Sequence, residues 1–433
     1  MGVLASIWRW LVSLGFASRR PAAVMTASPA TIPSAVPVFG ARRPLIDKNG
    51  ALAGFEFRLP SAVAKRLSSA ANATAAAAHA TALLASMQGS IAAGRTALIS
   101  LPLSLLFRPA VLAAIPPGVW IAVSDADQPA IQSPRAHEAL TALVRAGAKI
   151  GGVGRPIPGC DFVVLDATAI SASALAENIV AIRAMWGEVQ VVATGVCSIT
   201  DLEYLLEHGV NLAAGIVDHA TAAEERSPMS PRLKQICRLI HHVVSDDDVI
   251  EIARSLRGEV ELSYQLLRHA NSAAMGLTHQ PESVDHAAML LGRDGLYRWL
   301  TMLLLGGSSG RSTSRALREI ALARARLLET LAGYNGASTS GMFTMGLLSL
   351  IDVMLQIPMA DALDQLPTAP AMREALLEGT GEWREALVLV KALERGDLST
   401  AASLAWSFGG LPGVMADSDE AWRWAAETSR AMH

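Results

Sequence analysis

The periodicity of hydrophobic and polar positions changes once along this 433-residue chain, near residue 226. Upstream of that point, apolar runs of strand length alternate with segments of helical spacing. Strands that alternate with helices predict a parallel α/β sheet, and this many units favour a closed barrel. The expected strands are 36–39, 52–58, 97–101, 119–123, 149–152, 162–165, 189–193 and 212–217, and the expected helices are 62–93, 134–146, 173–186 and 199–208.

Downstream of residue 226, the strand alternation stops and apolar residues recur at helical spacing, which predicts an all-α bundle. A Pro-bounded link at 227–231 marks the boundary, and a helix is expected at 231–244. We therefore divide the chain into three parts. These are an N-terminal helix and linker at 1–35, an α/β domain at 36–222 and a helical domain at 226–430.

The stretch 255–305 predicts three short helices separated by two breaks. The second of them should span 284–291 and stop at Gly292, because glycine is a common helix terminator. The third should begin near Asp294 and is apolar almost all round, so we expect it to be buried. The first has one apolar face, made of Leu262, Leu266, Leu267 and Ala270.

Composition excludes several classes of protein. Hydrophobic residues make up 51% of the chain and charged residues 17%, which is typical of a folded, helix-rich protein rather than a disordered one. The net charge of −3 provides no chain-wide basic surface, so we expect no nucleic-acid partner. The three cysteines are scattered singly, which favours a reducing cytoplasm and buried thiols over disulfides.

The N-terminal segment 3–16 is strongly apolar but too short to span a membrane, and Arg9 interrupts it. Arg19 and Arg20 follow this segment, whereas a signal peptide carries its positive charge in front. Docking on a protein, disorder and contact with a membrane surface by residues 3–16 all stay open. The Pro/Ala/Ser/Thr-rich stretch 21–37 is predicted to be a linker.

Several blocks of the helical half resemble the HDOD family, a relative of the HD-GYP domains. They are Leu266-Leu267-Arg268, Asn271-Ser272-Ala273, the AAMLLG segment that ends at Gly292, the GLLSLID block at 346–352 and the tail 386–424. In the first half, residues 43–50 followed by Gly54-Phe55-Glu56 resemble the opening of an EAL domain. In this order, the blocks are similar to bacterial EAL–HDOD signalling proteins. The resemblance implies a truncated, degenerate TIM-like EAL barrel, with a helix missing between Gly154 and Asp161, followed by an HD-related helical bundle.

The EAL resemblance implies a site in which acidic residues and an asparagine hold Mg²⁺ or Mn²⁺ for hydrolysis of cyclic di-GMP. Glu56 and Asp166 match two of these positions. The other matched positions lack the family's residue types, and they are Ser100, Ala122, Val164 and Thr194. We therefore expect no catalytic residues, no metal site and no cofactor, with Glu56 and Asp166 as remnants that cap or pair locally. Weak cation binding by these two carboxylates is the alternative.

An HD hydrolase needs adjacent His and Asp ligands, and none of the ten histidines is followed by Asp. His241 and His242 lie on different sides of their helix, and the acidic run 246–248 precedes an apolar helix, where acids serve as caps. His269, His279 and His286 are predicted to be surface or core histidines, and the alternative is that they line one pocket, because they are close in sequence. The arginines between 311 and 326 predict a solvated helix face, with a basic binding stripe as the alternative.

The sequence therefore predicts a cytoplasmic signalling protein in which neither half retains a catalytic set. We expect it to act through regulated interaction with protein partners, in a pathway linked to cyclic di-GMP. Two alternatives stay open: a cyclic di-GMP receptor that does not hydrolyse the nucleotide, and a residual cyclic di-GMP phosphodiesterase.

Overall fold

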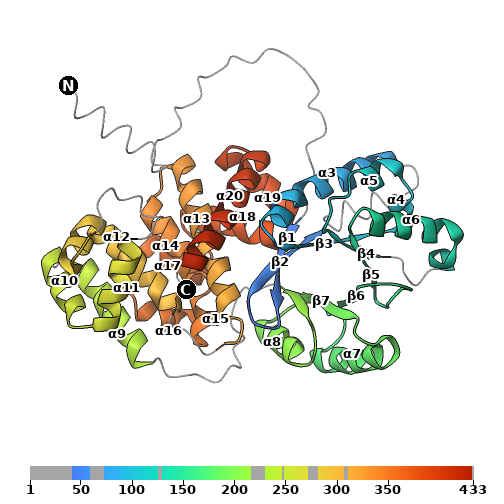
Figure 1. Cartoon of the computed structure of the whole chain (residues 1–433). Helices are drawn as coiled ribbons and strands as arrows, with labels where there is room; N and C mark the ends of the chain where they lie inside the picture. The colour runs from blue at the N-terminus through green and yellow to red at the C-terminus, as the bar shows by residue number, and fades with distance from the viewer. Residues whose placement is uncertain are drawn as a thin grey trace, which may run out of the picture.

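The computed structural model describes residues 41–58, 73–124, 129–215, 230–245, 248–271, 281–306 and 311–431. The first half of these residues forms a closed barrel, and the second half is helical (Figure 1). The α/β barrel followed by an all-α region, as predicted from the sequence, is thus confirmed. The strands, in barrel order, are β1 (Ala41–Asp47), β2 (Leu52–Arg58), β3 (Thr96–Leu101), β4 (Trp120–Val123), β5 (Lys149–Val153), β6 (Phe162–Asp166), β7 (Gln190–Val196) and β8 (Leu212–Gly215).

The strands β2 to β8 run parallel, whereas β1 pairs antiparallel with both of its neighbours and closes the barrel. Strand β1 was not predicted, and the strand expected at 36–39 lies outside the described residues. No helix occurs between β5 and β6, as the sequence indicated. The barrel helices are α3 (Ala73–Ala92), α4 (Leu103–Leu106), α5 (Pro109–Ala113), η2 (Pro129–Gln132), α6 (Pro134–Arg145), α7 (Ala172–Trp186) and α8 (Ile199–Glu207).

The barrel interior is filled by inward-pointing side chains of alternate strand positions. The rings of Trp120 and Phe162, the first residues of β4 and β6, lie 4.9 Å apart in this interior. Gly151 faces the Phe162 ring so closely that any side chain there would overlap it, which explains why β5 carries glycine. This interior core consists of Leu45, Leu98, Trp120, Ala122, Phe162, Val164, Val192, Leu212 and Ala214.

The helical region begins after the boundary segment 216–229, which lies outside the described residues. The predicted break at Gly292 is confirmed, because this residue has φ 65° within α12 and interrupts its helical geometry. The helices are α9 (Pro231–Val244), α10 (Val249–Arg257), α11 (Val260–Ala270), α12 (Val284–Gly306), α13 (Ser314–Asn335), α14 (Thr339–Leu348), α15 (Ile351–Leu355), α16 (Met359–Asp364), α17 (Pro370–Arg373), η4 (Glu374–Glu378), α18 (Arg384–Arg395), α19 (Leu398–Ala405), η5 (Trp406–Phe408) and α20 (Leu411–Ala431).

Helix α13 is the central element of the helical region, and α14 and α20 pack along it. The prediction of a solvated arginine face on this segment is wrong. Arg318 is 8% exposed and Arg324 is 1% exposed. The Arg324 guanidinium donates two hydrogen bonds to the Glu394 carboxylate on α18, at 2.8 and 2.6 Å, which is how a buried charge is accommodated.

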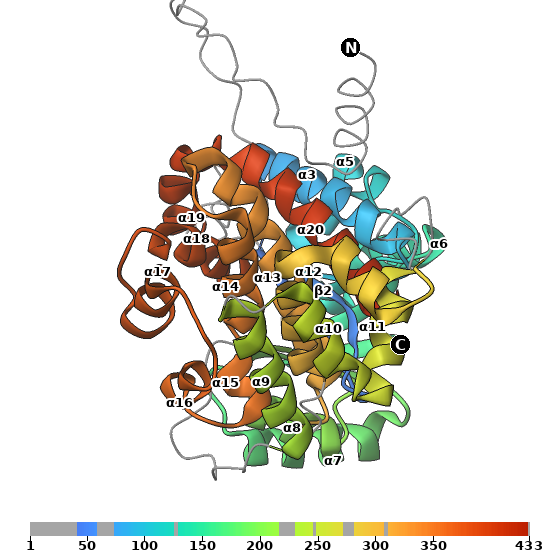
Figure 2. The same cartoon turned by 90° about the vertical axis from the view of Figure 1, so that its left-hand side faces the viewer.

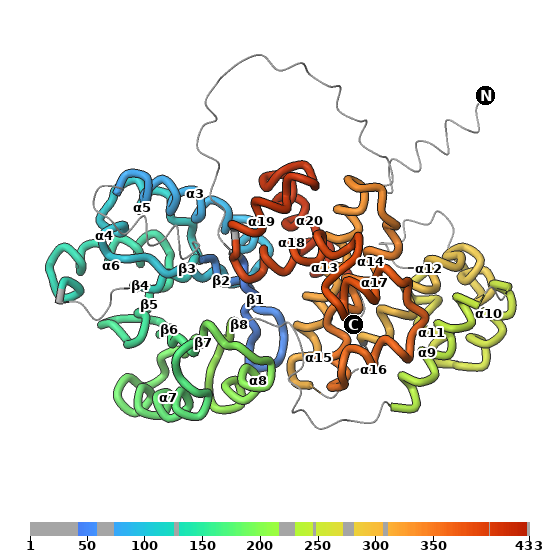
Figure 3. The backbone as a smooth tube through the Cα atoms, turned by 180° about the vertical axis from the view of Figure 1, so that it is seen from behind, coloured from blue at the N-terminus to red at the C-terminus, as the bar shows by residue number. Residues whose placement is uncertain are grey.

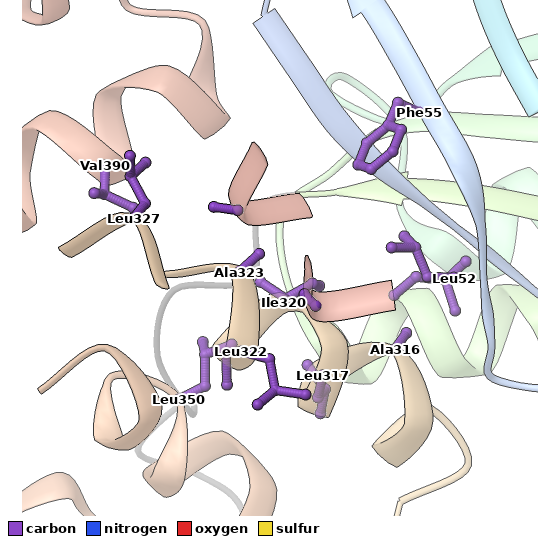
Figure 4. Close-up of a cluster of buried hydrophobic side chains, with 14 of the residues drawn as sticks. Leu52, Phe55, Ala316, Leu317, Ile320, Leu322, Ala323, Leu327, Leu350 and Val390 are labelled. Atoms are coloured by element: carbon purple, nitrogen blue, oxygen red, sulfur yellow. The ribbon is translucent and has the colours of Figure 1, made fainter. Parts of the chain in front are cut away.

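The outer face of β2 packs directly on α13. Figure 4 shows Leu52 and Phe55 of β2 facing Ala316 and Ile320 of α13. The Phe55 ring also meets the edge of Trp422 on α20, with ring centroids 4.9 Å apart. One continuous hydrophobic core therefore joins the barrel to the helices. Helix α18 also lies against the barrel, next to β1, as the view from behind shows (Figure 3).

The tryptophans of the C-terminal tail differ in exposure, since Trp406 is 85% exposed and Trp383 is buried. Of the cysteines, Cys237 is buried as expected, whereas Cys197 is exposed. Within the described part of the chain, no helix has both the length and the apolar character needed to cross a membrane.

Candidate functional site at the barrel mouth

The carboxyl ends of parallel strands meet at one edge of a barrel, and this edge is where side chains of different strands converge. In this protein the edge contains the ends of β2 to β8 together with the start of the antiparallel β1. It brings together Arg43 of β1, Glu56 and Arg58 of β2, and Asp166 of β6. We call these four residues the mouth cluster.

Glu56 is the most buried member of the mouth cluster, with 3% of its surface exposed. It lies opposite Arg43 in the β1–β2 register. Its Oε1 lies 3.6 Å from Nε of Arg58, and among the described residues its Oε2 has no hydrogen-bond partner. Burial raises the pKa of Glu56, and Asp166 raises it further, while Arg58 and Arg43 lower it. The net effect is a pKa above the ordinary value for a glutamate.

Asp166 lies at the exposed end of β6 and is held by local hydrogen bonds. Its Oδ1 accepts from the backbone N–H of Thr168 at 3.0 Å and from the Thr168 hydroxyl at 2.8 Å. The predicted local pairing of both carboxylates is therefore present. The structure also brings the two residues into the same mouth, close enough for their charges to interact.

The arginines in the mouth cluster set its electrostatics. Burial lowers the pKa of Arg43, while the carboxylates of Glu56 and Asp166 raise it. The Arg43 side chain reaches beyond the barrel, because its Nη2 donates to the backbone carbonyl of Arg395, at the end of α18, at 3.1 Å. Two carboxylates therefore share the mouth with two guanidinium groups.

The other positions that align with EAL metal ligands carry no carboxylate. The register places Ser100 beside Ala122, and Asp166 beside Thr194. Over the described ranges, no group of three or more His, Cys, Asp or Glu side chains is placed to hold a metal ion. Mg²⁺ and Mn²⁺ prefer several oxygen ligands, and guanidinium groups beside the carboxylates oppose a cation. The described residues of the mouth therefore do not fit such a metal.

The HDOD motif positions have structural roles where they are described. Leu266 is fully buried and Leu267 is partly buried on α11. Asn271 ends α11, and its Nδ2 donates to the carbonyl of Pro281 at 3.3 Å, which ties that end to the start of the next segment. Gly292 supplies the break in α12. Ser272 and Ala273 lie outside the described residues.

Two of the three histidines near Asn271 lie in the described part of the chain. His269 is partly buried, and this burial lowers its pKa to about 4. His286 is exposed, and His279 lies outside the described residues. Asp248 caps α10 by accepting from the N–H of Ile250 at 3.1 Å, which confirms that part of the capping prediction. Asp246 and Asp247 lie outside the described residues.

Sequence reasoning missed the polar residues that join the two halves. Arg95, just before β3, forms an ion pair with Glu319 of α13 and donates to the carbonyl of Leu52. Glu203 of α8 forms an ion pair with Arg311 at 2.9 Å. These partners are far apart in the sequence, and no local motif marks them. The one sequence signal was the occurrence of arginines among the many Ala and Leu residues of the α13 segment.

Comparison with known proteins assigns the helical region. The HDOD domain model matches residues 230–378. This part of the chain is an HDOD domain. The match ends within the helical region, and α18 to α20 continue from it to residue 431.

Two curated proteins are similar to parts of the chain. The uncharacterized protein YuxH of Bacillus subtilis is 29% identical over 160 residues, which cover 36% of this chain and 39% of that protein. The cyclic di-GMP phosphodiesterase CdgJ of Vibrio cholerae is 25% identical over 186 residues, which cover 42% of this chain and 43% of that protein. The chain thus spans about two fifths of the length of these relatives.

Solved structures of EAL proteins are similar to the barrel side of the chain. A manganese and cyclic di-GMP complex of Klebsiella pneumoniae BlrP1 has a TM-score of 0.35 and 18% identity, and the match covers 50% of this chain and 66% of that one. An EAL domain protein of Listeria monocytogenes has a TM-score of 0.31 and 15% identity, with 41% and 85% covered.

Proposed function

We propose that this protein is a non-catalytic component of cyclic di-GMP signalling, which acts in the cytoplasm through regulated interaction with protein partners. The supporting observation is the composition of the mouth cluster. Glu56 is buried beside the guanidinium groups of Arg43 and Arg58, which oppose a cation, and burial raises its pKa, which works against the ionised form that a metal ligand needs. The link to cyclic di-GMP is supported by the HDOD domain and by similarity to CdgJ.

The absence of hydrolysis is tested by incubating the full chain with cyclic di-GMP in Mg²⁺ and in Mn²⁺ and analysing the nucleotide by chromatography. We expect intact nucleotide in both metals. Formation of the linear dinucleotide that is lost in Glu56→Gln but retained in Glu207→Gln would overturn the proposal. Glu207 is a suitable control because it is an exposed glutamate at the end of α8.

The interaction role is supported by apolar side chains exposed on the HDOD domain. On α11, Val260 is 85% exposed and Tyr264 is 65% exposed, and their i, i+4 spacing places them on one face. Contiguous exposed apolar patches mark protein contacts, and we propose this face of α11 as such a contact. Partners captured by the full chain should be lost from a Val260→Glu, Tyr264→Glu double variant and retained by Arg145→Glu, which places negative charge on an exposed barrel position. Equal capture by all three proteins would contradict a role for this face.

A receptor that binds cyclic di-GMP without hydrolysis is a second candidate, favoured by the guanidinium groups of Arg43 and Arg58 at the mouth. Guanidinium groups match phosphate oxygens in geometry and charge. Calorimetric titration separates the two candidates. Binding that Arg58→Ala weakens at least tenfold would identify a receptor, and no heat at roughly micromolar concentrations would leave protein interaction as the function.

A further inference from the structure

Two adjoining cavities lie between the barrel and the C-terminal helix, with volumes of about 460 and 440 Å³. Helices α3 and α20 run side by side there (Figure 2). Both cavities are lined by Ala93 and Arg95 on the barrel side and by Glu319, Ala426 and Arg430 on the helical side. We call this pair of cavities the α3–α20 groove. Each is within the size range of small-molecule sites.

The groove stays open because α3 presents only small residues to it. Ser86, Gly89, Ser90 and Ala93 line the wall, and none has a side chain long enough to reach α20. A Cβ atom added at Gly89 would meet nothing within 4 Å. Empty space of this kind next to charged side chains distinguishes the groove from the tightly packed interface of β2 with α13.

Positive charge dominates the lining. The groove contains five arginines and three carboxylates. Arg42 pairs with Asp419 at 2.5 Å, and Arg95 pairs with Glu319, so one carboxylate remains for the other three arginines. These are Arg315, Arg423 and Arg430, and the carboxylate is Glu427. Since Arg423 and Arg430 are exposed, this excess positive charge is accessible from solvent.

The floor of the groove is apolar. Phe55 of β2 and Trp422 of α20 lie there with their rings in edge contact. A ligand in the groove therefore meets guanidinium groups on its walls and aromatic carbon at its base. Guanidinium forks bind phosphate oxygens bidentately, and the excess of two positive charges matches the charge of a phosphate dianion.

We propose that the α3–α20 groove binds a small phosphate-bearing molecule. One wall belongs to the barrel and the other to α13 and α20, so the bound molecule stabilises the contact between the two halves of the protein. This site is separate from the mouth cluster, and the proposal does not depend on the proposed function.

The test is calorimetric titration of the full chain, at low salt, with inorganic pyrophosphate, GMP and cyclic di-GMP, and with citrate as a carboxylate probe. We expect at least one phosphate compound to bind, and citrate to bind at least tenfold more weakly. An Arg423→Glu, Arg430→Glu double variant should weaken that binding at least tenfold, whereas Arg145→Glu on the barrel surface should not. Equal binding of citrate, or no binding of any phosphate compound, would overturn the proposal.

A second pair of variants tests the location without changing charge. Gly89→Leu should fill the groove and weaken binding at least tenfold. Gly333→Leu is the matched control, because Gly333 is also a helical glycine with nothing within 4 Å of its added Cβ, and it does not line the groove. Equal binding to both leucine variants would place the ligand elsewhere and contradict the proposal. Cyclic di-GMP binding that is lost in Arg58→Ala but not in Gly89→Leu would support the receptor reading of the mouth and count against the groove.

Discussion

The carboxylate of Glu203, on barrel helix α8, accepts hydrogen bonds from both the backbone N–H and the hydroxyl of Thr313, the N-cap residue of α13, at 3.1 and 2.6 Å. The same carboxylate pairs with Arg311 at 2.9 Å. A second N–H of the first turn, that of Ala316, donates to the carbonyl of Gly50 in the β1–β2 turn at 3.0 Å. The barrel thus supplies the cap that α13 lacks within its own segment.

Removal of this cap should destabilise the contact between the halves. The Arg311 side chain is 5% exposed and that of Glu203 is 15% exposed, so Glu203→Ala leaves a nearly buried guanidinium without its carboxylate. We expect a loss of roughly 2–4 kcal/mol in the free energy of unfolding. Urea midpoints measure the loss, and faster amide exchange at 313–317 locates it. The control, Glu207→Ala on the exposed side of α8, should leave both unchanged, and a Glu203→Ala protein equal to this control would refute the capping role.

The barrel was predictable because each of its inner strands is a short apolar run between turn signals. Strand β1 was missed because its sequence, ARRPLID, contains two arginines and a proline and has no such run. Its position depends on pairing with β2 and β8 and on the packing of α18, which are tertiary contacts.

Neither the interface between the barrel and the helical region nor the burial of α13 could be predicted from local sequence patterns. Arg318 and Arg324 look like residues of a solvated helix face when only i, i+3 and i, i+4 neighbours are considered. The partner of Arg324 is Glu394, 70 residues away, and Arg95 is 224 residues from Glu319. Helical periodicity carries no information about such distant pairs. The candidate carboxylates Glu56 and Asp166 were identified from the sequence, but the arginines around them were not.

The pH dependence of stability should reveal the state of Glu56. Burial raises its pKa above the ordinary value of 4.5. The folded protein therefore binds this proton more tightly than the unfolded chain does, and the contribution of Glu56 to stability falls as pH rises through its folded pKa. Gln cannot ionise, so the variant Glu56→Gln does not lose this contribution. The urea midpoint of the variant minus that of the wild type should therefore increase between pH 4.5 and 7.5. A difference that stays constant or shrinks over this range would show that Glu56 is ionised in the fold.

His269 should make the protein sensitive to acid. Burial lowers its pKa from 6.5 to about 4, so the unfolded chain binds the proton more tightly between these values. Stability from the neutral imidazole is complete above pH 6.5 and is lost as pH falls towards 4, by up to about 3 kcal/mol. His269→Gln should lose less stability than the wild type between pH 7 and 4.5, as followed by urea unfolding at each pH. The exposed His286→Gln serves as the control and should follow the wild type, and identical curves for all three proteins would rule out this role of His269.

Gly346 should be essential for the contact between α13 and α14. A Cβ atom at this position would overlap the backbone of Ala325 on α13, and the neighbouring residues Met345 and Leu347 are fully buried. Gly346→Ala must therefore separate two helices within a closed core, and we expect a loss of about 3 kcal/mol or more. Gly333→Ala on exposed α13 surface meets no atom and should instead add about 0.5–1 kcal/mol, because alanine favours the helix. Thermal and urea unfolding measure both changes, and a Gly346→Ala protein as stable as Gly333→Ala would show that these helices are not as closely packed as the structure indicates.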